Sequence, residues 1–201
     1  MAGTDRRQQI IKAAAQLAVE GGIDSVSVRA VAARAGIGAS TLRHYFPTQA
    51  ALYDAVLEPA LDLLVSDKRI GDRRVRPQRR LTECLMQFLP GGQEGHLAGM
   101  SNEQALDQWF GLYVTALGPQ RTEGGRAALT WLSTRLSGSV RGWLTTLDEE
   151  GVLAVPVEDA LRLLLAVVDG ICLQVMTPGG PLRVDSVEPT LSLAVERVIT
   201  G

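Results

Sequence analysis

Apolar residues recur at helical spacing along nearly the whole chain, and glycine or proline marks the ends of most of these segments. This period predicts an all-α protein of about nine helices, with no convincing strand. The predicted helices cover residues 5–19, 28–35, 39–46, 48–64, 77–89, 102–117, 120–149, 157–176 and 185–200. No repeat or low-complexity segment interrupts them, and no apolar run is long enough to span a bilayer.

Two short helical segments within residues 27–46 are separated by a glycine turn. Ser27 is a favoured N-cap for the first segment, and Gly36 stands where a left-handed residue ends a helix. The second segment follows Gly38, a weaker cap, and places Leu42 and Phe46 on one inward face. Two short helices joined by a tight glycine turn form a helix-turn-helix, whose second helix enters the major groove of DNA.

Short motifs in and around this stretch point to one family. They are Ile10-Ile11-Lys12-Ala13-Ala14, Val28-Arg29-Ala30-Val31-Ala32, Ala35-Gly36-Ile37, Thr41-Leu42 and His44-Tyr45-Phe46-Pro47. With them, the first fifty or so residues resemble the DNA-binding domain of tetracycline-repressor (TetR) family regulators. The resemblance implies a helix-turn-helix DNA-binding domain over residues 1–47 and a helical effector-binding and dimerisation domain over residues 48–201.

The predicted DNA contacts lie on and beside the second short helix. They are Ser27, Arg29, Ala39, Ser40, Thr41, Arg43, His44, Tyr45 and Gln49. The resemblance assigns phosphate contacts to the hydroxyl-bearing members, and these contacts set register without reading sequence. Arg29, Arg43 and His44 are the candidates for base edges, because arginine can bond both acceptors of a guanine.

The sequence departs from the family at three of these positions. Gly38, Arg43 and Gln49 stand where serine, tyrosine and lysine are usual, and that lysine meets a phosphate. Arg43 therefore has two interpretations, a base contact or a phosphate contact that replaces the tyrosine. His44 can alternatively be a packed histidine.

Residues 157–176 are apolar on almost every side, so this helix must be buried on its own core and against a partner. With the final helix, it resembles the pair that forms a four-helix dimer interface in the family. The predicted homodimer contacts are Leu161, Leu164, Leu165, Val168, Cys172, Leu191, Val195 and Val198. A homodimer implies a roughly palindromic operator.

The aromatic residues beyond the first domain are candidates for an apolar effector pocket. The predicted ligand contacts are Phe88, Met100, Trp109, Phe110, Tyr113, Trp131 and Trp143. Each can alternatively fill the core, as aromatic residues at helical spacing usually do. Arg135, Asp169 and His96 are candidates for polar contacts with the effector, with surface ion pairs as the alternative. The resemblance implies a small molecule, partly apolar, that releases the regulator from DNA and so relieves repression.

Charge is distributed unevenly along the chain. Residues 1–50 hold six basic and three acidic residues, a local +3, whereas residues 51–201 hold 14 basic and 19 acidic residues, a local −5. Basic charge concentrated on a helix-turn-helix is the electrostatic pattern expected of a DNA-binding domain, with chance variation in surface charge as the alternative. Residues 68–80 form the most basic stretch, which we interpret as a solvated loop or helix face, with added phosphate contacts as the alternative.

The residues needed for catalysis or metal binding are sparse. The only two histidines, His44 and His96, have no partner at metal-ligand or triad spacing, and no phosphate-binding loop follows a strand. Residues 148–150 are interpreted as an exposed acidic helix end. Cys84 and Cys172 lie far apart, which fits reduced structural thiols, and the N-terminus has no apolar leader, so we expect a cytoplasmic bacterial protein with no cofactor. The alternative to a DNA-binding regulator is a helical protein-interaction adaptor.

Overall fold

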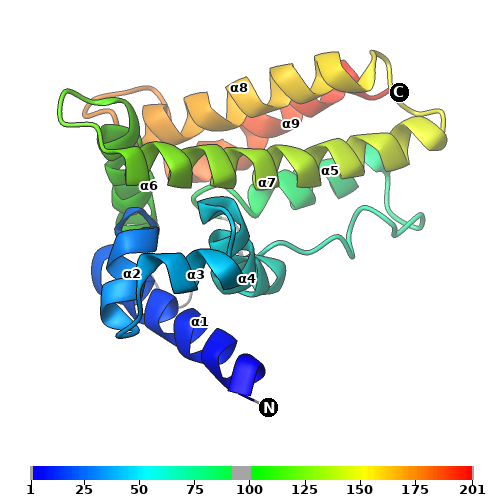
Figure 1. Cartoon of the computed structure of the whole chain (residues 1–201). Helices are drawn as coiled ribbons and strands as arrows, with labels where there is room; N and C mark the ends of the chain where they lie inside the picture. Colours follow the sequence, from blue (N-terminus) through cyan, green and yellow to red (C-terminus); the bar gives the residue numbers. More distant parts are fainter. Residues whose placement is uncertain (1, 92–100, 201) are drawn as a thin grey trace. The chain divides into compact units, whose positions relative to one another are not determined.

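A computed structural model describes residues 2–91 and 101–200 of the chain (Figure 1). Within these ranges the chain is helical, apart from an antiparallel bridge between Leu153 and Ile199, so the all-α prediction is confirmed. The chain folds as two compact units, one of Met1–Leu63 with Asp107–Thr134 and the other of Leu64–Leu106 with Arg135–Gly201. Residues 1–47 lie wholly in the first unit. No helix of the described ranges is long and apolar enough to cross a membrane.

Each predicted helix has a counterpart in the structure. The helices are α1 Ala2–Gly21, α2 Val28–Arg34, α3 Ala39–Tyr45, α4 Gln49–Leu64, α5 Pro77–Met86, α6 Asn102–Leu117, α7 Glu123–Glu149, α8 Val157–Met176 and α9 Val187–Val198. Short 3₁₀ turns at Ile23–Ser25 and Val184–Ser186 precede α2 and α9. The main difference is at α5, which ends at Met86 and leaves Phe88 and Leu89 in the turn that follows.

The first unit is built on the packing of α1 against α2 and of α2 against α3, the blue helices of Figure 1. Its core is formed by small and branched apolar side chains together with Phe46, Tyr53 and Trp131. Tyr53 of α4 meets Trp131 of α7 edge-on, with ring centroids 5.8 Å apart. The Trp131 indole Nε1 also donates a 2.9 Å hydrogen bond to Asp54 Oδ1. Buried aromatic side chains and a shared hydrogen bond therefore hold α4 against the first part of α7.

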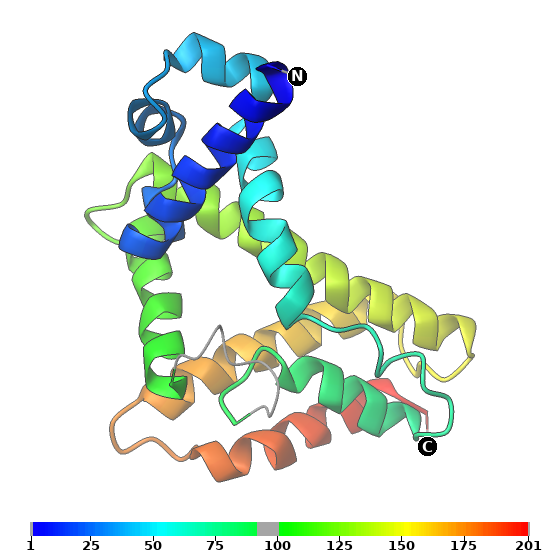
Figure 2. The same ribbon diagram turned by 90° about the horizontal axis from the view of Figure 1, so that it is seen from below.

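The second unit is built around α9, which packs against both α5 and α8 (Figure 2). Its core gathers Leu81, Cys84 and Leu85 of α5, the inward faces of α8 and α9, and Trp143 of α7. Trp143 stacks on Phe88, with centroids 5.5 Å apart and planes 17° apart, and its indole N–H donates to Asp67. The α8 helix is therefore buried on one face within its own unit.

A buried ion pair corrects two of the sequence interpretations. The side chain of Arg80 is only 2% exposed and pairs with the mostly buried carboxylate of Glu150, while Nη1 also donates to the Ile70 carbonyl. Arg73 pairs with the same carboxylate at 3.2 Å. The basic stretch is thus not simply a solvated face, and Glu150 is not part of an exposed helix end. Sequence alone gave no signal for this pairing, because the two partners are 70 residues apart.

Candidate nucleic-acid interface

The local sequence builds the helix-turn-helix through three backbone positions. Ser27 Oγ accepts a 3.2 Å hydrogen bond from the Ala30 amide, which makes Ser27 the N-cap of α2. Gly36 ends this helix with a φ of +64°, a conformation that costs a residue with a Cβ atom about 1–2 kcal/mol. Gly38 then begins α3 in an extended conformation without a side-chain cap.

The α3 helix buries one side chain and exposes most of the rest. Leu42 is completely buried and packs in the core of the first unit, as the spacing predicts. The side chains of Ala39, Ser40, Thr41, Arg43 and His44 are exposed, and Tyr45 is partly buried. A helix anchored on one face by a single leucine therefore leaves these five side chains open to solvent.

Aromatic and basic side chains surround α3. The rings of His44 and Tyr45 meet edge-on with centroids 5.4 Å apart, and His44 is exposed rather than packed in the core. The guanidinium carbon of Arg7 lies 5.2 Å from the ring centroid of Phe46, so Arg7 of α1 is held beside the end of α3. Arg29 on α2 is exposed as well. These cations give the surface the charge that phosphates require.

Not every basic residue of this domain is available to DNA. Arg34 makes two hydrogen bonds to the carboxylate of Glu20, at 2.9 and 2.7 Å, which join α2 to α1. This hydrogen-bonded pairing holds the pKa of the Glu20 carboxyl below its usual range. All three arginines Arg29, Arg34 and Arg43 are exposed, but the guanidinium of Arg34 is paired with Glu20 of its own domain.

Gln49 differs from the other predicted DNA contacts. Its Nε2 donates to the Val26 carbonyl at 2.9 Å and to the Tyr53 hydroxyl at 2.6 Å, and the residue is partly buried. The amide group therefore makes contacts within the first unit, from the first turn of α4. Sequence reasoning did not single out Tyr53 or Asp54, although each is a polar group within an apolar helical stripe.

The predicted ligand contacts fall in both units. Trp131 lies in the core of the first unit. Trp109 and Tyr113 of α6 belong to the same unit, are partly buried, and pack against each other with ring centroids 5.2 Å apart. Phe110 is partly buried in the same helix. Phe88 and Trp143 stack on each other in the second unit. Met100, like the polar candidate His96, lies outside the described residues.

The residues predicted at the dimer interface lie mostly in the interior of the second unit. Of the eight residues, Leu161, Leu164, Val168, Cys172, Leu191, Val195 and Val198 are buried in the core of the second unit itself, and Leu165 is partly buried. Most of the surface of these side chains therefore packs within their own chain. The outward apolar residues of the same helices are Leu163, Leu173 and Leu193, which are 44%, 51% and 62% exposed.

These outward leucines were missed because α8 is apolar on nearly every side, so the sequence did not show which face turns inward. On α8 they form a stripe with Ala166 and Gly170, at spacings of three and four residues from Leu163 to Leu173. A Cβ atom added at Gly170 would meet nothing within 4 Å. The stripe therefore has space in front of it in the single chain.

The thiols and the remaining acidic candidate also have defined places. Cys84 and Cys172 are free and buried, and burial raises the pKa of each thiol to about 12. Asp169 lies on the outer side of α8, where desolvation raises the pKa of its carboxyl. Within the described ranges, no group of three or more histidine, cysteine, aspartate or glutamate residues has the arrangement of a metal site.

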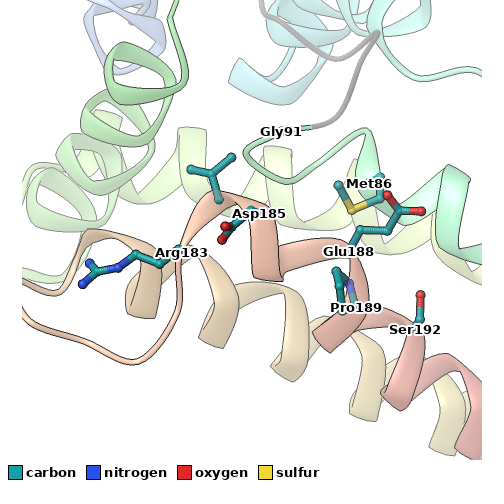
Figure 3. A pocket seen from close by; sticks show the side chains of 8 residues that line it. Met86, Gly91, Arg183, Asp185, Glu188, Pro189 and Ser192 are labelled. Carbon is teal, nitrogen blue, oxygen red and sulfur yellow. The ribbon is translucent and has the colours of Figure 1, made fainter.

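A groove of about 890 Å³ opens in the second unit beside α9 (Figure 3). It is lined by Met86, Gly91, Arg183, Val184, Asp185, Glu188, Pro189 and Ser192. Among the described residues, none of those predicted to bind an effector lines it. Its charged side chains carry both signs, and they project from the start of α9 and the turn before it.

Comparison with known proteins identifies the helix-turn-helix. Residues 10–56 match the family model of bacterial regulatory proteins, tetR family. The HTH-type transcriptional regulator PksA of Bacillus subtilis (strain 168) is 26% identical over 200 residues, which cover 96% of this chain and 89% of that protein. Both similarities include the exposed α3 surface described above.

Solved structures share the fold over nearly the whole chain. The multidrug binding protein EbrR is 26% identical, with a TM-score of 0.52 and 94% of each chain covered. A TetR transcription regulator from Haloarcula marismortui ATCC 43049 is 19% identical, with a TM-score of 0.52 and coverage of 98% of this chain and all of the other. TetR-family regulators are not enzymes, in agreement with the sequence prediction. Residues 10–56 therefore form a DNA-binding domain of the tetR-family type, and the chain as a whole shares the fold of TetR-family transcriptional regulators.

Proposed function

We propose that this regulator binds a roughly palindromic operator as a homodimer, represses transcription in the cytoplasm and is released by a small molecule. The DNA-binding part rests on the surface of α3. Leu42 is the one residue of this helix that is buried, and most of the others are exposed. Ser40, Thr41 and Tyr45, with Ser27 before α2, are the proposed phosphate contacts. Arg29, Arg43 and His44 are the proposed base contacts, because their charged or polar groups are exposed and can reach a groove.

The homodimer is proposed to form through the outer faces of α8 and α9. Leu163 and Leu173 are large apolar side chains at helical spacing, and their exposure costs free energy until a partner covers them. Ala166 and Gly170 between them permit close approach of a second helix. A two-fold axis through this face gives two copies of α3, which match two half-sites about one helical turn apart or a multiple of it.

The effector is proposed to be a partly apolar small molecule bound in residues 48–201. Structures similar to this chain include the multidrug binding protein EbrR complexed with proflavin or ethidium and a regulator from Saccharomonospora viridis in complex with choline. These ligands are organic cations with apolar parts. Trp109, Phe110 and Tyr113 of α6 supply aromatic surface of the kind that binds such groups. A ligand releases DNA only by binding the DNA-free conformation more tightly.

Selection of duplexes from a random library by the purified full chain tests the DNA-binding part. We expect enrichment of a palindromic motif whose affinity falls steeply with salt, because each neutralised phosphate releases counterions. An affinity measurement on the selected duplex at several salt concentrations supplies that slope. Absence of enrichment at low salt, for protein refolded to remove any carried ligand, would favour a helical interaction adaptor instead.

Titration of the protein–duplex complex with cationic and neutral aromatic compounds tests the effector part. Tryptophan fluorescence reports binding, and the fraction of bound duplex reports release. A compound that changes fluorescence and lowers duplex affinity supports the proposal. A compound that changes tryptophan fluorescence while all of the duplex stays bound would argue against release by that compound.

A further inference from the structure

Gln49 connects α4 to the segment that enters the helix-turn-helix. Its side-chain nitrogen donates to the carbonyl of Val26, which is buried and lies just before Ser27, the N-cap of α2. The same nitrogen donates to the hydroxyl of Tyr53 one turn further along α4. The Val26 carbonyl can only accept a hydrogen bond, so the nitrogen of the amide group must face it.

Tyr53 is in turn fixed by α7. Its side chain is fully buried, its ring meets that of Trp131 edge-on, and the Trp131 indole bonds Asp54, the next residue of α4. All of these residues belong to the first compact unit. A continuous series of contacts therefore runs from Trp131 through Tyr53 and Gln49 to the start of α2.

This arrangement leaves Gln49 poorly suited to a DNA phosphate. A primary amide has two N–H donors, and here they are directed to Val26 and Tyr53. A phosphate oxygen accepts hydrogen bonds and cannot donate one to the remaining amide oxygen. The lysine that is usual in the family meets a phosphate from this position, so the substitution changes what the position does.

We propose that Gln49 is a positioning residue for DNA binding, which acts by fixing the Val26 carbonyl at the entry to α2 and is itself oriented by Tyr53. The inference rests on the proposed DNA-binding function and assigns Gln49 a role other than a DNA contact. Tyr53 acts through Gln49, because its hydroxyl accepts a hydrogen bond from the Gln49 amide and is buried, so it cannot reach DNA. Both side chains set how α2 and α3 are held in the free protein.

Substitutions Gln49→Met and Tyr53→Phe test this inference in the full chain. Methionine keeps the length of the side chain without a donor, and phenylalanine keeps the buried ring without the hydroxyl. We expect each variant to bind the selected duplex about fivefold more weakly, the effect of one lost net hydrogen bond. We expect the double variant to lose no more duplex affinity than the single variant that binds the duplex more weakly. In the DNA-free protein, backbone amides of α2 should exchange hydrogen about fivefold faster in Gln49→Met.

The possible outcomes separate the roles. A direct DNA contact would weaken binding in Gln49→Met but leave α2 exchange and the Tyr53→Phe variant unchanged, which would overturn the inference. Additive losses in the double variant would overturn it as well. Gln16→Met, at an exposed glutamine of α1, is the matched control and should match the parent in both measurements. If the parent chain binds no duplex, the proposed function fails together with this inference; if the parent binds and both variants equal it, only this inference fails.

Discussion

Arg43 is the exposed cation of α3 that most directly distinguishes base readout from phosphate contact. We expect Arg43→Ala to weaken binding to the selected duplex by about 1–3 kcal/mol, because a bidentate arginine–guanine contact is worth that much. Binding to a scrambled duplex at the same salt concentration should weaken much less. Parallel affinity measurements on the two duplexes provide the comparison.

The control is Arg141→Ala, which removes an exposed arginine that pairs with Glu158 in the second unit. This variant should bind both duplexes as the parent does. An equal loss on both duplexes for Arg43→Ala would assign Arg43 to a phosphate, in place of the tyrosine that is usual in the family.

The pair of Arg80 and Glu150 is the main charged interaction in the core of the second unit. Hydrogen bonding from Arg80 holds the pKa of the Glu150 carboxyl below its ordinary value of 4.5. The stabilisation is therefore fully present above pH 4.5 and is lost as the pH falls through the lower pKa of the folded state. We expect Glu150→Gln to lower the free energy of unfolding at pH 7 by about 3 kcal/mol, since it leaves a buried guanidinium without its counter-ion.

Denaturant unfolding between pH 3 and pH 7 measures this effect. The variant should lose less stability than the parent as the pH falls, and the two curves should converge at the acid end. Glu149→Gln, at the exposed neighbouring carboxylate, is the matched control and should change stability by less than about 0.5 kcal/mol. Parallel pH curves for Glu150→Gln and the parent would contradict the assignment.

At the scale of elements, Gly36 controls the turn between α2 and α3. A Cβ atom added there would meet nothing within 4 Å, so any cost of Gly36→Ala comes from its φ of +64° alone. We expect this substitution to lower the free energy of unfolding by about 1–2 kcal/mol. Thermal or denaturant unfolding of the full chain measures it.

Gly142 provides a control with the opposite sign. It also has open space in front of it, but it lies within α7 in a helical conformation. Alanine at this position should stabilise the protein by about 0.5–1 kcal/mol, because glycine is the weaker helix former. Destabilisation by both substitutions would show that space, rather than backbone conformation, limits these sites.

The elements also show how far sequence reasoning reaches. The helices were predictable because apolar periodicity, the Ser27 cap and the Gly36 turn are local signals. The Arg80–Glu150 pair was not predictable, because a buried charge depends on a partner that only the fold brings near. The inward face of α8 was ambiguous for a related reason. Its buried positions recur at helical spacing, but leucine also stands on the outer face, so the pattern alone did not separate a face that packs on its own core from one that packs on a partner. On α3, by contrast, Leu42 is the single inward position of its turn, and the exposed surface followed from the pattern.

At the scale of the whole molecule, the proposed homodimer links dimerisation to DNA binding. One copy of α3 contacts only one half-site, and coupling of two copies multiplies their affinities, an effect of about 100-fold or more. The proposed dimer surface on α8 is therefore expected to control operator affinity although it contains no DNA contact. A substitution on the outer face of α8 should therefore change operator affinity without disturbing the inner face, which packs in the core.

Gly170→Leu tests that surface. The added side chain begins in open space within the single chain, and leucine is a better helix former than glycine, so the subunit should remain folded. A second helix packed closely against Ala166 and Gly170 would be pushed away. We expect a monomer in sedimentation analysis and a loss of about 100-fold in affinity for a duplex with two half-sites, with little change in affinity for a duplex with one half-site.

Gly138→Leu, at an exposed glycine of α7 with equally open space, is the control and should remain a dimer with the affinity of the parent. A Gly170→Leu protein that still sediments as a dimer would place the interface away from this face of α8.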